Sequence, residues 1–134
     1  MTRLLRPGTL LGTAALLVAL ACGDSNVLGP DNQLEVTNAT DNFQIQASSM
    51  VDITQTLTYT WQNTGTQANV NQSGNITAGS ATLTISDADG TEVYSRTLTQ
   101  TGTFQTDPGT AGVWTIVIEL SGADGTLNAR VQKP

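Results

Sequence analysis

The chain has 134 residues, of which 38% are hydrophobic, 12% charged and 4% aromatic, a length that fits one domain. It contains one cysteine and no histidine. These counts exclude a disulfide framework, a zinc site of cysteine and histidine ligands, and a catalytic triad that uses histidine. Nothing in the composition indicates a reaction or a cofactor, so we expect a protein that is not an enzyme and binds no cofactor.

The first 21 residues have the pattern of an export signal peptide. Arg3 and Arg6 make the beginning of the chain basic, and an apolar run from Leu10 to Leu20 follows them. A run of this length is typical of the central part of a signal peptide, whereas a membrane-spanning helix needs about 20 apolar residues. We therefore expect residues 1–21 to be removed from the mature protein.

The apolar run ends in Ala19-Leu20-Ala21-Cys22-Gly23, which resembles the lipobox of bacterial lipoproteins. In that family a diacylglyceryl group is attached to the cysteine, and the signal peptide is cut directly before it. The resemblance implies cleavage between Ala21 and Cys22 and a lipid on Cys22, although Ala19 stands where the family most often has leucine. The alternative is an ordinary secretory signal that is cut after the Ala-Leu-Ala sequence.

The same resemblance implies a location, which is the bacterial cell envelope with the chain anchored by its lipid. Gly23 stands where inner-membrane lipoproteins of enteric bacteria have aspartate, so the outer membrane is favoured over the inner membrane. Two or more acyl chains hold a protein to a membrane durably, where a single chain does not.

The mature chain is strongly acidic. After cleavage it keeps three basic and eleven acidic residues, a formal charge of −8. Such a charge disfavours binding to nucleic acid, and the chain also lacks the basic cluster that attracts anionic membrane surfaces. The partners that we expect are therefore the membrane, through the lipid, and a protein or glycan of the envelope.

Residues 22–32 and residues 33–134 differ in composition. The first segment contains the lipidated cysteine followed by turn-forming residues, which predicts a flexible tether. From Gln33 onward, apolar and polar residues alternate with a period of two, as in half-buried strands, most clearly from Val51 to Gln62. The residues expected to face the core are Phe43, Ile45, Ala47, Ile53, Leu57, Tyr59, Trp61, Ala81, Leu83, Ile85, Trp114, Ile116, Ile118, Leu120, Leu127, Ala129 and Val131.

These alternating segments are separated by glycine, asparagine and aspartate, and no window after residue 33 has the period of a helix. The pattern predicts an all-β fold, an antiparallel β-sandwich of the jelly-roll or Ig-like kind with about seven to nine strands.

Asp124-Gly125 is a strong signal for a two-residue hairpin turn. Such a turn would place apolar residues opposite one another on one face and an ion pair on the other. The expected pairs are Leu120 with Ala129, Ile118 with Val131, and Glu119 with Arg130.

A similar turn sequence occurs at Asp89-Gly90 and predicts a second hairpin. A two-residue loop would place Ile85 opposite Tyr94, whereas a bulged loop would place it opposite Val93. Both registers remain open from the sequence.

Residues 79–132 resemble small extracellular bacterial sandwiches of the pre-peptidase C-terminal domain type. The resemblance rests on the strand from Gly79 to Asp87, the segment from Ala111 to Ile116, and Gly125-Thr126-Leu127. Those domains are non-catalytic accessory modules, so the resemblance implies a binding or scaffolding role.

Two groups of residues are candidates for a binding site. Asp87, Asp89 and Glu92 could supply oxygen ligands to calcium, although aspartate and glycine are also the residues that a turn requires. Aromatic side chains could stack on sugar rings or fill the core, and burial of the two tryptophans would favour the core and a scaffolding role over sugar binding. The stacking candidates are Tyr59, Trp61, Tyr94 and Trp114. These groups define the alternative function, a carbohydrate-binding or calcium-dependent adhesion domain.

Overall fold

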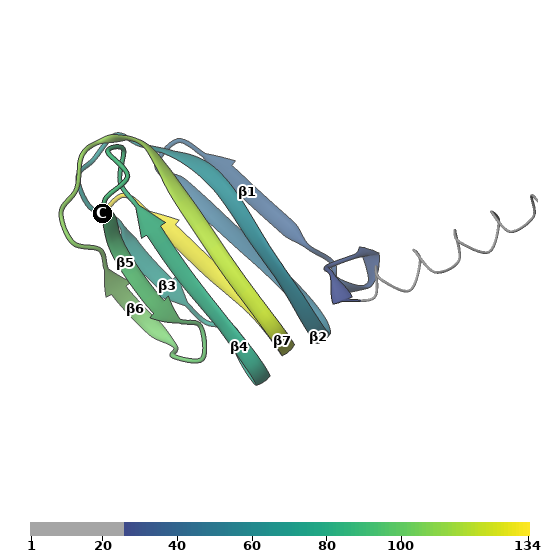
Figure 1. Ribbon diagram of the computed structural model, residues 1–134. Coiled ribbons are helices and arrows are strands. Elements are labelled where there is room, and N and C mark those ends of the chain that lie inside the picture. Colours follow the sequence, from purple (N-terminus) through teal and green to yellow (C-terminus); the bar gives the residue numbers. More distant parts are fainter. Residues whose placement is uncertain (1–25) are drawn as a thin grey trace, which may run out of the picture.

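The computed structural model describes residues 26–134, so the signal peptide and Cys22 lie outside the described residues. Within them the chain forms a β-sandwich of seven strands, which confirms the predicted fold class (Figure 1). No helix in this part of the chain is long and apolar enough to span a membrane. The strands are β1 (Glu35–Ala39), β2 (Asn42–Asn63), β3 (Asn69–Gln72), β4 (Asn75–Ser86), β5 (Glu92–Thr97), β6 (Gly102–Gln105) and β7 (Gly112–Gln132).

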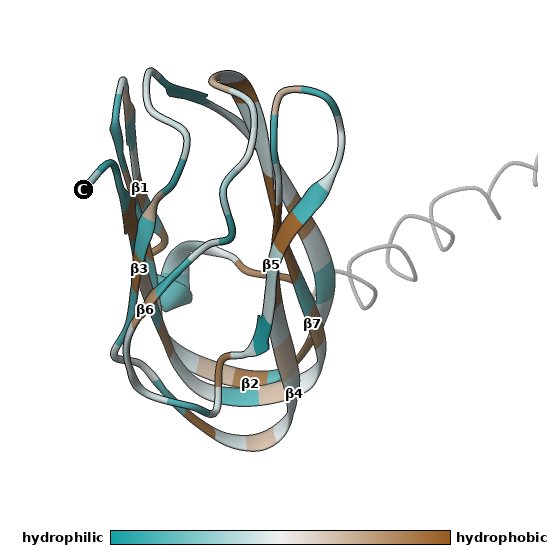
Figure 2. Cartoon of the chain, turned by 90° about the vertical axis from the view of Figure 1, so that its left-hand side faces the viewer, coloured by the Kyte–Doolittle hydropathy of each residue, from teal (hydrophilic) through white to brown (hydrophobic). Residues whose placement is uncertain are grey.

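The two longest strands, β2 and β7, run through both layers of the sandwich. Residues 42–47 of β2 pair antiparallel with residues 127–132 of β7, and residues 55–63 of β2 pair with residues 112–120 of β7. The first pairing belongs to a layer in the order β1-β2-β7-β3-β6, and the second to a layer in the order β2-β7-β4-β5. Figure 2 shows the two layers side by side, with the strands curving from one into the other.

The core lies between the inner faces of the two layers. Most residues that the period of two assigned to the core are buried, whereas Leu57 and Tyr59, near the edge of the second layer, are only partly buried. The rings of Trp61 and Trp114 lie opposite each other in the β2–β7 register and make an edge-to-face contact, with centroids 6.0 Å apart. The indole N–H of Trp61 donates to the backbone carbonyl of Ala39, and the indole N–H of Trp114 donates to that of Thr110.

Both long strands bend where they pass from one layer to the other. Ser49 and Asp52 in β2, and Gly122 and Gly125 in β7, have positive φ values, and the register shifts at three places between Ala47 and Gln55. Such irregularities are β-bulges, which bend a strand and increase its twist. The bulges let both strands turn together without losing their pairing.

The hairpin predicted at Asp124-Gly125 is wrong, because both residues lie inside β7 at this bend. The Asp124 carboxylate accepts the backbone N–H of Asp52 at 2.7 Å, so it fixes the bend of the neighbouring strand instead of closing a turn. Gly125 is required there because a Cβ atom would clash with the backbone carbonyl of Asn75 in β4.

The cross-strand partners therefore differ from those expected. Ile118 lies opposite Leu57 and Leu83, and Ala129 lies opposite Ile45 and Gln72. The predicted ion pair between Glu119 and Arg130 is not formed, since the two residues belong to different layers. The other members of the predicted apolar pairs also have different partners. Leu120 lies opposite Gln55 and Ala81, and Val131 lies opposite Phe43 and Val70.

The second predicted hairpin, between β4 and β5, is present. Ile85 lies opposite Tyr94, as a two-residue loop requires, and a bulge follows because Ser86 lies opposite Glu92. Val93 is the extra residue, and both it and Tyr94 are buried. The structure thus combines features of the two registers that the sequence left open.

Residues 26–32, which we expected to belong to the flexible tether, lie against the bend of β2. The backbone N–H of Leu28 donates to the side chain of Gln55 at 2.9 Å, and a short 3-10 helix covers Pro30–Asn32. Asn32 is buried, and its amide group donates to the carbonyls of Ser48 and Ser49 at 3.0 and 3.1 Å. This part of the segment is therefore held to the domain.

The contacts of Asn32 yield a prediction about stability. In Asn32→Ala, the carbonyls of Ser48 and Ser49 would lose their donor next to a residue with positive φ, so we expect a loss of about 1–3 kcal/mol in the free energy of unfolding. Asp31→Ala is the control, because Asp31 is exposed and an exposed substitution changes stability by roughly 0.5 kcal/mol or less. Urea denaturation measures both, and equal midpoints for the two variants would contradict the contact.

Candidate binding pocket on the first layer

The outer face of the first layer is rich in amide side chains. Alternate residues of β2, β7 and β3 point away from the core, and the register aligns them in rows across the strands, such as Gln44, Arg130 and Asn71. We call this surface the amide face, and its members on these three strands are Asn42, Gln44, Gln46, Asn128, Arg130, Gln132, Asn69 and Asn71.

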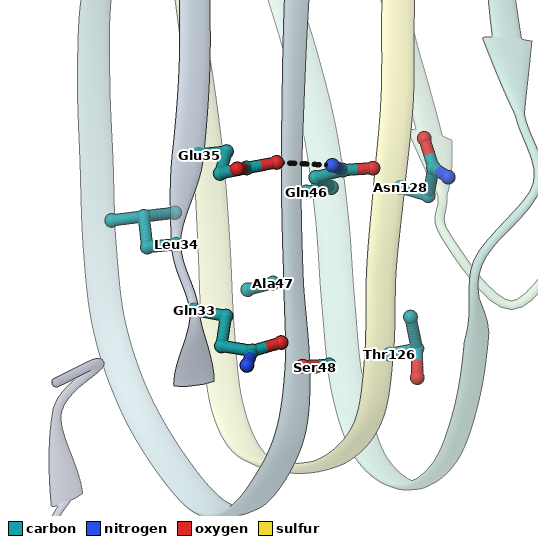
Figure 3. Close-up of a pocket in the computed structure, with 8 residues that line it drawn as sticks. All are labelled: Gln33, Leu34, Glu35, Gln46, Ala47, Ser48, Thr126 and Asn128. Carbon is teal, nitrogen blue, oxygen red and sulfur yellow. Dashed lines mark hydrogen bonds between the residues drawn. The ribbon is translucent and has the colours of Figure 1, made fainter. Parts of the chain in front are cut away.

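A pocket of about 610 Å³ lies at the end of the amide face that adjoins the bend. Figure 3 shows its polar side chains on three neighbouring segments, the entry to β1, the end of the first half of β2, and β7 just after the bend. Leu34 and Ala47 also line the pocket. Its polar side chains are Gln33, Glu35, Gln46, Ser48, Thr126 and Asn128.

These side chains suit a ligand with many hydroxyl groups. Amides both donate and accept hydrogen bonds, hydroxyls do the same, and a carboxylate accepts. Within the pocket, Gln46 donates its amide N–H to the Glu35 carboxylate, which leaves the Gln46 oxygen and the second Glu35 oxygen for a ligand. The volume is in the range of small-molecule sites, about 300–1,000 Å³.

The structure places two of the three calcium candidates, Asp87 and Asp89, in a turn that uses their oxygens internally, and the third, Glu92, at the exposed start of β5. Asp87 is buried, and its carboxylate accepts the backbone N–H groups of Asp89 (3.0 Å), Thr91 (2.8 Å) and Thr110 (2.9 Å). The Asp89 carboxylate accepts the Thr110 hydroxyl at 2.7 Å. Among residues 26–134, no three side chains of aspartate, glutamate, histidine or cysteine, Glu92 included, form a group that could hold a metal ion.

Of the four stacking candidates, three are buried. Trp61 and Trp114 are 1% and 0% exposed, and Tyr94 is 7% exposed with its hydroxyl donating to the buried Gln72 side chain at 2.6 Å. Tyr59 is partly buried, with its ring centroid 5.3 Å from that of Phe43. These rings therefore fill the core, and burial of the two tryptophans is the outcome expected to favour scaffolding over stacking on sugars.

Residues of the pocket were missed by reasoning from the sequence. Gln46 and Asn128 were visible as the polar positions of alternating segments, which is the signal that could have found them. Their proximity depends on the pairing of β2 with β7, and the expected hairpin paired that part of β7 with its own first half.

No protein-family model matches the sequence, and no curated protein matches it. Among solved structures, the chain is similar to a carbohydrate-binding module from Cellvibrio mixtus lichenase 5A in complex with cellotriose. The identity is 17% and the TM-score 0.45, over 83% of this chain and 93% of that one. Procruciferin, an 11S globulin of Brassica napus, is 13% identical with a TM-score of 0.40, over 83% of this chain and 28% of that one. Such similarities are too distant to indicate a ligand.

The Asp87 carboxylate yields a prediction about pH. Hydrogen bonds from the backbone N–H groups of Thr110 and Thr91 lower the pKa of Asp87 below its ordinary value of 3.8, against the opposing effect of burial. Because the folded-state pKa is the lower one, ionised Asp87 stabilises the fold fully above pH 3.8. This stabilisation is lost as the pH falls through the folded-state pKa.

We therefore expect Asp87→Asn to lower the melting temperature at pH 7, with the difference from wild type shrinking below about pH 4. Glu92→Gln, at an exposed position of the same hairpin, is the control and should melt close to wild type at pH 7. Thermal melts between pH 2.5 and pH 7 measure the difference, and one that stays constant over this range would contradict the role of the ionised carboxylate.

Proposed function

We propose that this chain is a lipid-anchored protein of a bacterial cell envelope whose β-sandwich binds a neutral glycan and performs no catalysis. The observation that carries the ligand proposal is the pocket at the end of the amide face, where side chains from three segments offer amide, hydroxyl and carboxylate groups. The anchor proposal rests on the lipobox-like sequence that ends at Cys22.

The charge of the chain supports a neutral ligand. A mature formal charge of −8 opposes the approach of anionic molecules, and Glu35 in the pocket adds a local negative charge. Glycans without acidic groups meet this condition and present the hydroxyls that the pocket's donors and acceptors can bind. Recognition would then depend on hydrogen bonds from the amide face and not on stacking against an aromatic platform.

The pocket is tested by paired substitutions on one face. We expect Gln46→Ala and Asn128→Ala each to weaken binding of a neutral trisaccharide about tenfold, the effect of losing roughly 1.4 kcal/mol of hydrogen bonding. The control is Asn69→Ala, on the amide face outside the pocket, which should bind as wild type. Isothermal titration with trisaccharides of glucose, mannose and N-acetylglucosamine measures the affinities.

Failure of all three trisaccharides to bind would contradict the glycan proposal. Equal weakening by Asn69→Ala would contradict the location of the site, since that residue does not line the pocket.

The anchor is tested by changing the only cysteine. We expect Cys22→Ala, expressed in a bacterial host, to move the protein from the membrane to the soluble fraction, because two or more acyl chains supply the attachment. Gly23→Ala is the control and should remain in the membrane fraction. Fractionation and immunoblotting measure the distribution, and mass spectrometry that finds a free thiol at Cys22 in the wild type would contradict lipidation.

A further inference from the structure

The second half of β2 is the outer strand of the second layer. It pairs with β7 on one side, and among the described strands none lies on its other side (Figure 1). The carbonyl of Gln62 accepts the backbone N–H of Asp41 at 2.9 Å, and the carbonyl of Thr60 accepts the side chain of Asn38 at 2.8 Å. Both donors come from outside β7, so the even-numbered residues of this half strand direct their backbone groups away from it.

Thr56 and Thr58 have the same orientation as Thr60 and Gln62, because backbone direction alternates with a period of two. Their N–H and C=O groups therefore lie at the edge of the sheet. Within residues 26–134, no hydrogen bond from another strand or loop reaches the backbone groups of these two threonines. A row of such groups is a template for pairing with another strand.

This edge lacks the usual protection against pairing. β2 carries no charged residue and no proline from Gln55 to Asn63, in a chain whose mature part has a formal charge of −8. Charges, prolines and short strands are the common means of blocking an edge. By contrast, the other edge of the same layer, β5, carries Glu92 and Arg96, and the edges of the first layer are short strands of five and four residues.

Apolar side chains are incompletely covered beside the same edge. Leu57 and Tyr59 point inward from the edge strand but are only partly buried, although they pack against the core. On β1, at the edge of the first layer, Val36 is also 38% exposed. A strand added next to β2 would cover Leu57 and Tyr59 and satisfy the free backbone groups together.

The sequence of the edge is complementary to itself. If two copies pair antiparallel about a two-fold axis at Thr58, Thr58 lies opposite its own copy, Thr56 lies opposite Thr60, and Leu57 lies opposite Tyr59. Threonine pairs then form on the outer face and apolar pairs on the inner face, both of which are favourable cross-strand combinations. The edge-directed backbone groups of Thr56, Thr58 and Thr60 would bond across the axis, with the second copy replacing the Asn38 side chain at the Thr60 carbonyl.

We propose that two copies of this chain pair through residues 56–60 of β2, antiparallel about a two-fold axis at Thr58, so that their second layers form one continuous sheet. This inference is independent of the proposed glycan site. The pocket lies on the outer face of the first layer, so a failure to bind glycan leaves the pairing untouched, and the reverse also holds.

The proposal is tested by a charge on the axis. All measurements use the full chain with Cys22→Ala, in detergent, so that neither the lipid nor a native thiol contributes. We expect sedimentation equilibrium to detect a dimer, and Thr58→Lys to weaken it at least about tenfold, because two like charges would face each other across the axis. Ser95→Lys, exposed on β5 at the opposite edge of the same layer, is the matched control and should leave the dimer unchanged.

A cysteine in place of Thr58 provides a second test that does not depend on destabilisation. Residues opposite each other at an antiparallel pair have Cα atoms within the range that a disulfide spans, about 4.4–6.8 Å. We expect oxidation to cross-link Thr58→Cys into a dimer but to leave Ser95→Cys monomeric on a non-reducing gel. A chain that is monomeric at all concentrations, a dimer that survives Thr58→Lys with circular dichroism unchanged, or equal cross-linking of the two cysteine variants would overturn the proposal.

Discussion

The continuous pairing of β2 with β7 is the interaction on which the rest of this structure depends. The two strands stay partners from Asn42 with Gln132 to Asn63 with Gly112, although both bend midway. Had only one of them bent, its free backbone groups would have been buried without partners, at a cost of about 1–3 kcal/mol each. The shared bend therefore satisfies the hydrogen bonds while it folds one long ribbon into both layers of the sandwich.

The bend also explains where glycine and aspartate occur. β4 crosses β7 so closely there that a Cβ at Gly79 would clash with the backbone of Gly122. At the same bend, the Asp124 carboxylate accepts a hydrogen bond from the backbone N–H of Asp52. These residue types are also those of a surface turn, which is why the local sequence resembles a hairpin signal.

Reasoning from the sequence could predict orientation, but it predicted strand partners only in the local β4–β5 hairpin. The period of two is a local property, so the inward positions of Ile118 and Ala129 followed from it directly, whereas it left open whether Trp61 and Trp114 are buried or stack on a ligand. Partners are set by register between distant segments, and the local turn signal at Asp124-Gly125 favoured the wrong ones. The pocket was out of reach for the same reason, because the bend and the β2–β7 register together bring Gln46 next to Asn128. The sequence also could not show that Asn32 inserts its amide under the bend.

The same arrangement determines which groups are left for binding. The carboxylate of Asp87, the amide of Gln72 and the hydroxyl of Tyr94 are all engaged inside the domain. What the fold presents outward is an amide face on one layer and an uncovered strand on the other. Because these surfaces lie on different layers, one can bind a ligand while the other pairs with a second copy.

Backbone proton contacts in the NMR spectrum test the central claim most directly. A β7 strand that stays paired with β2 predicts nuclear Overhauser effects between the backbones of Ile45 and Ala129, and between those of Leu57 and Ile118. The backbones of Ile118 and Val131 should show none, because they belong to layers that pack about 10 Å apart. Contacts between Ile118 and Val131 in place of these would show that β7 folds back on itself at Asp124-Gly125, and would contradict the account.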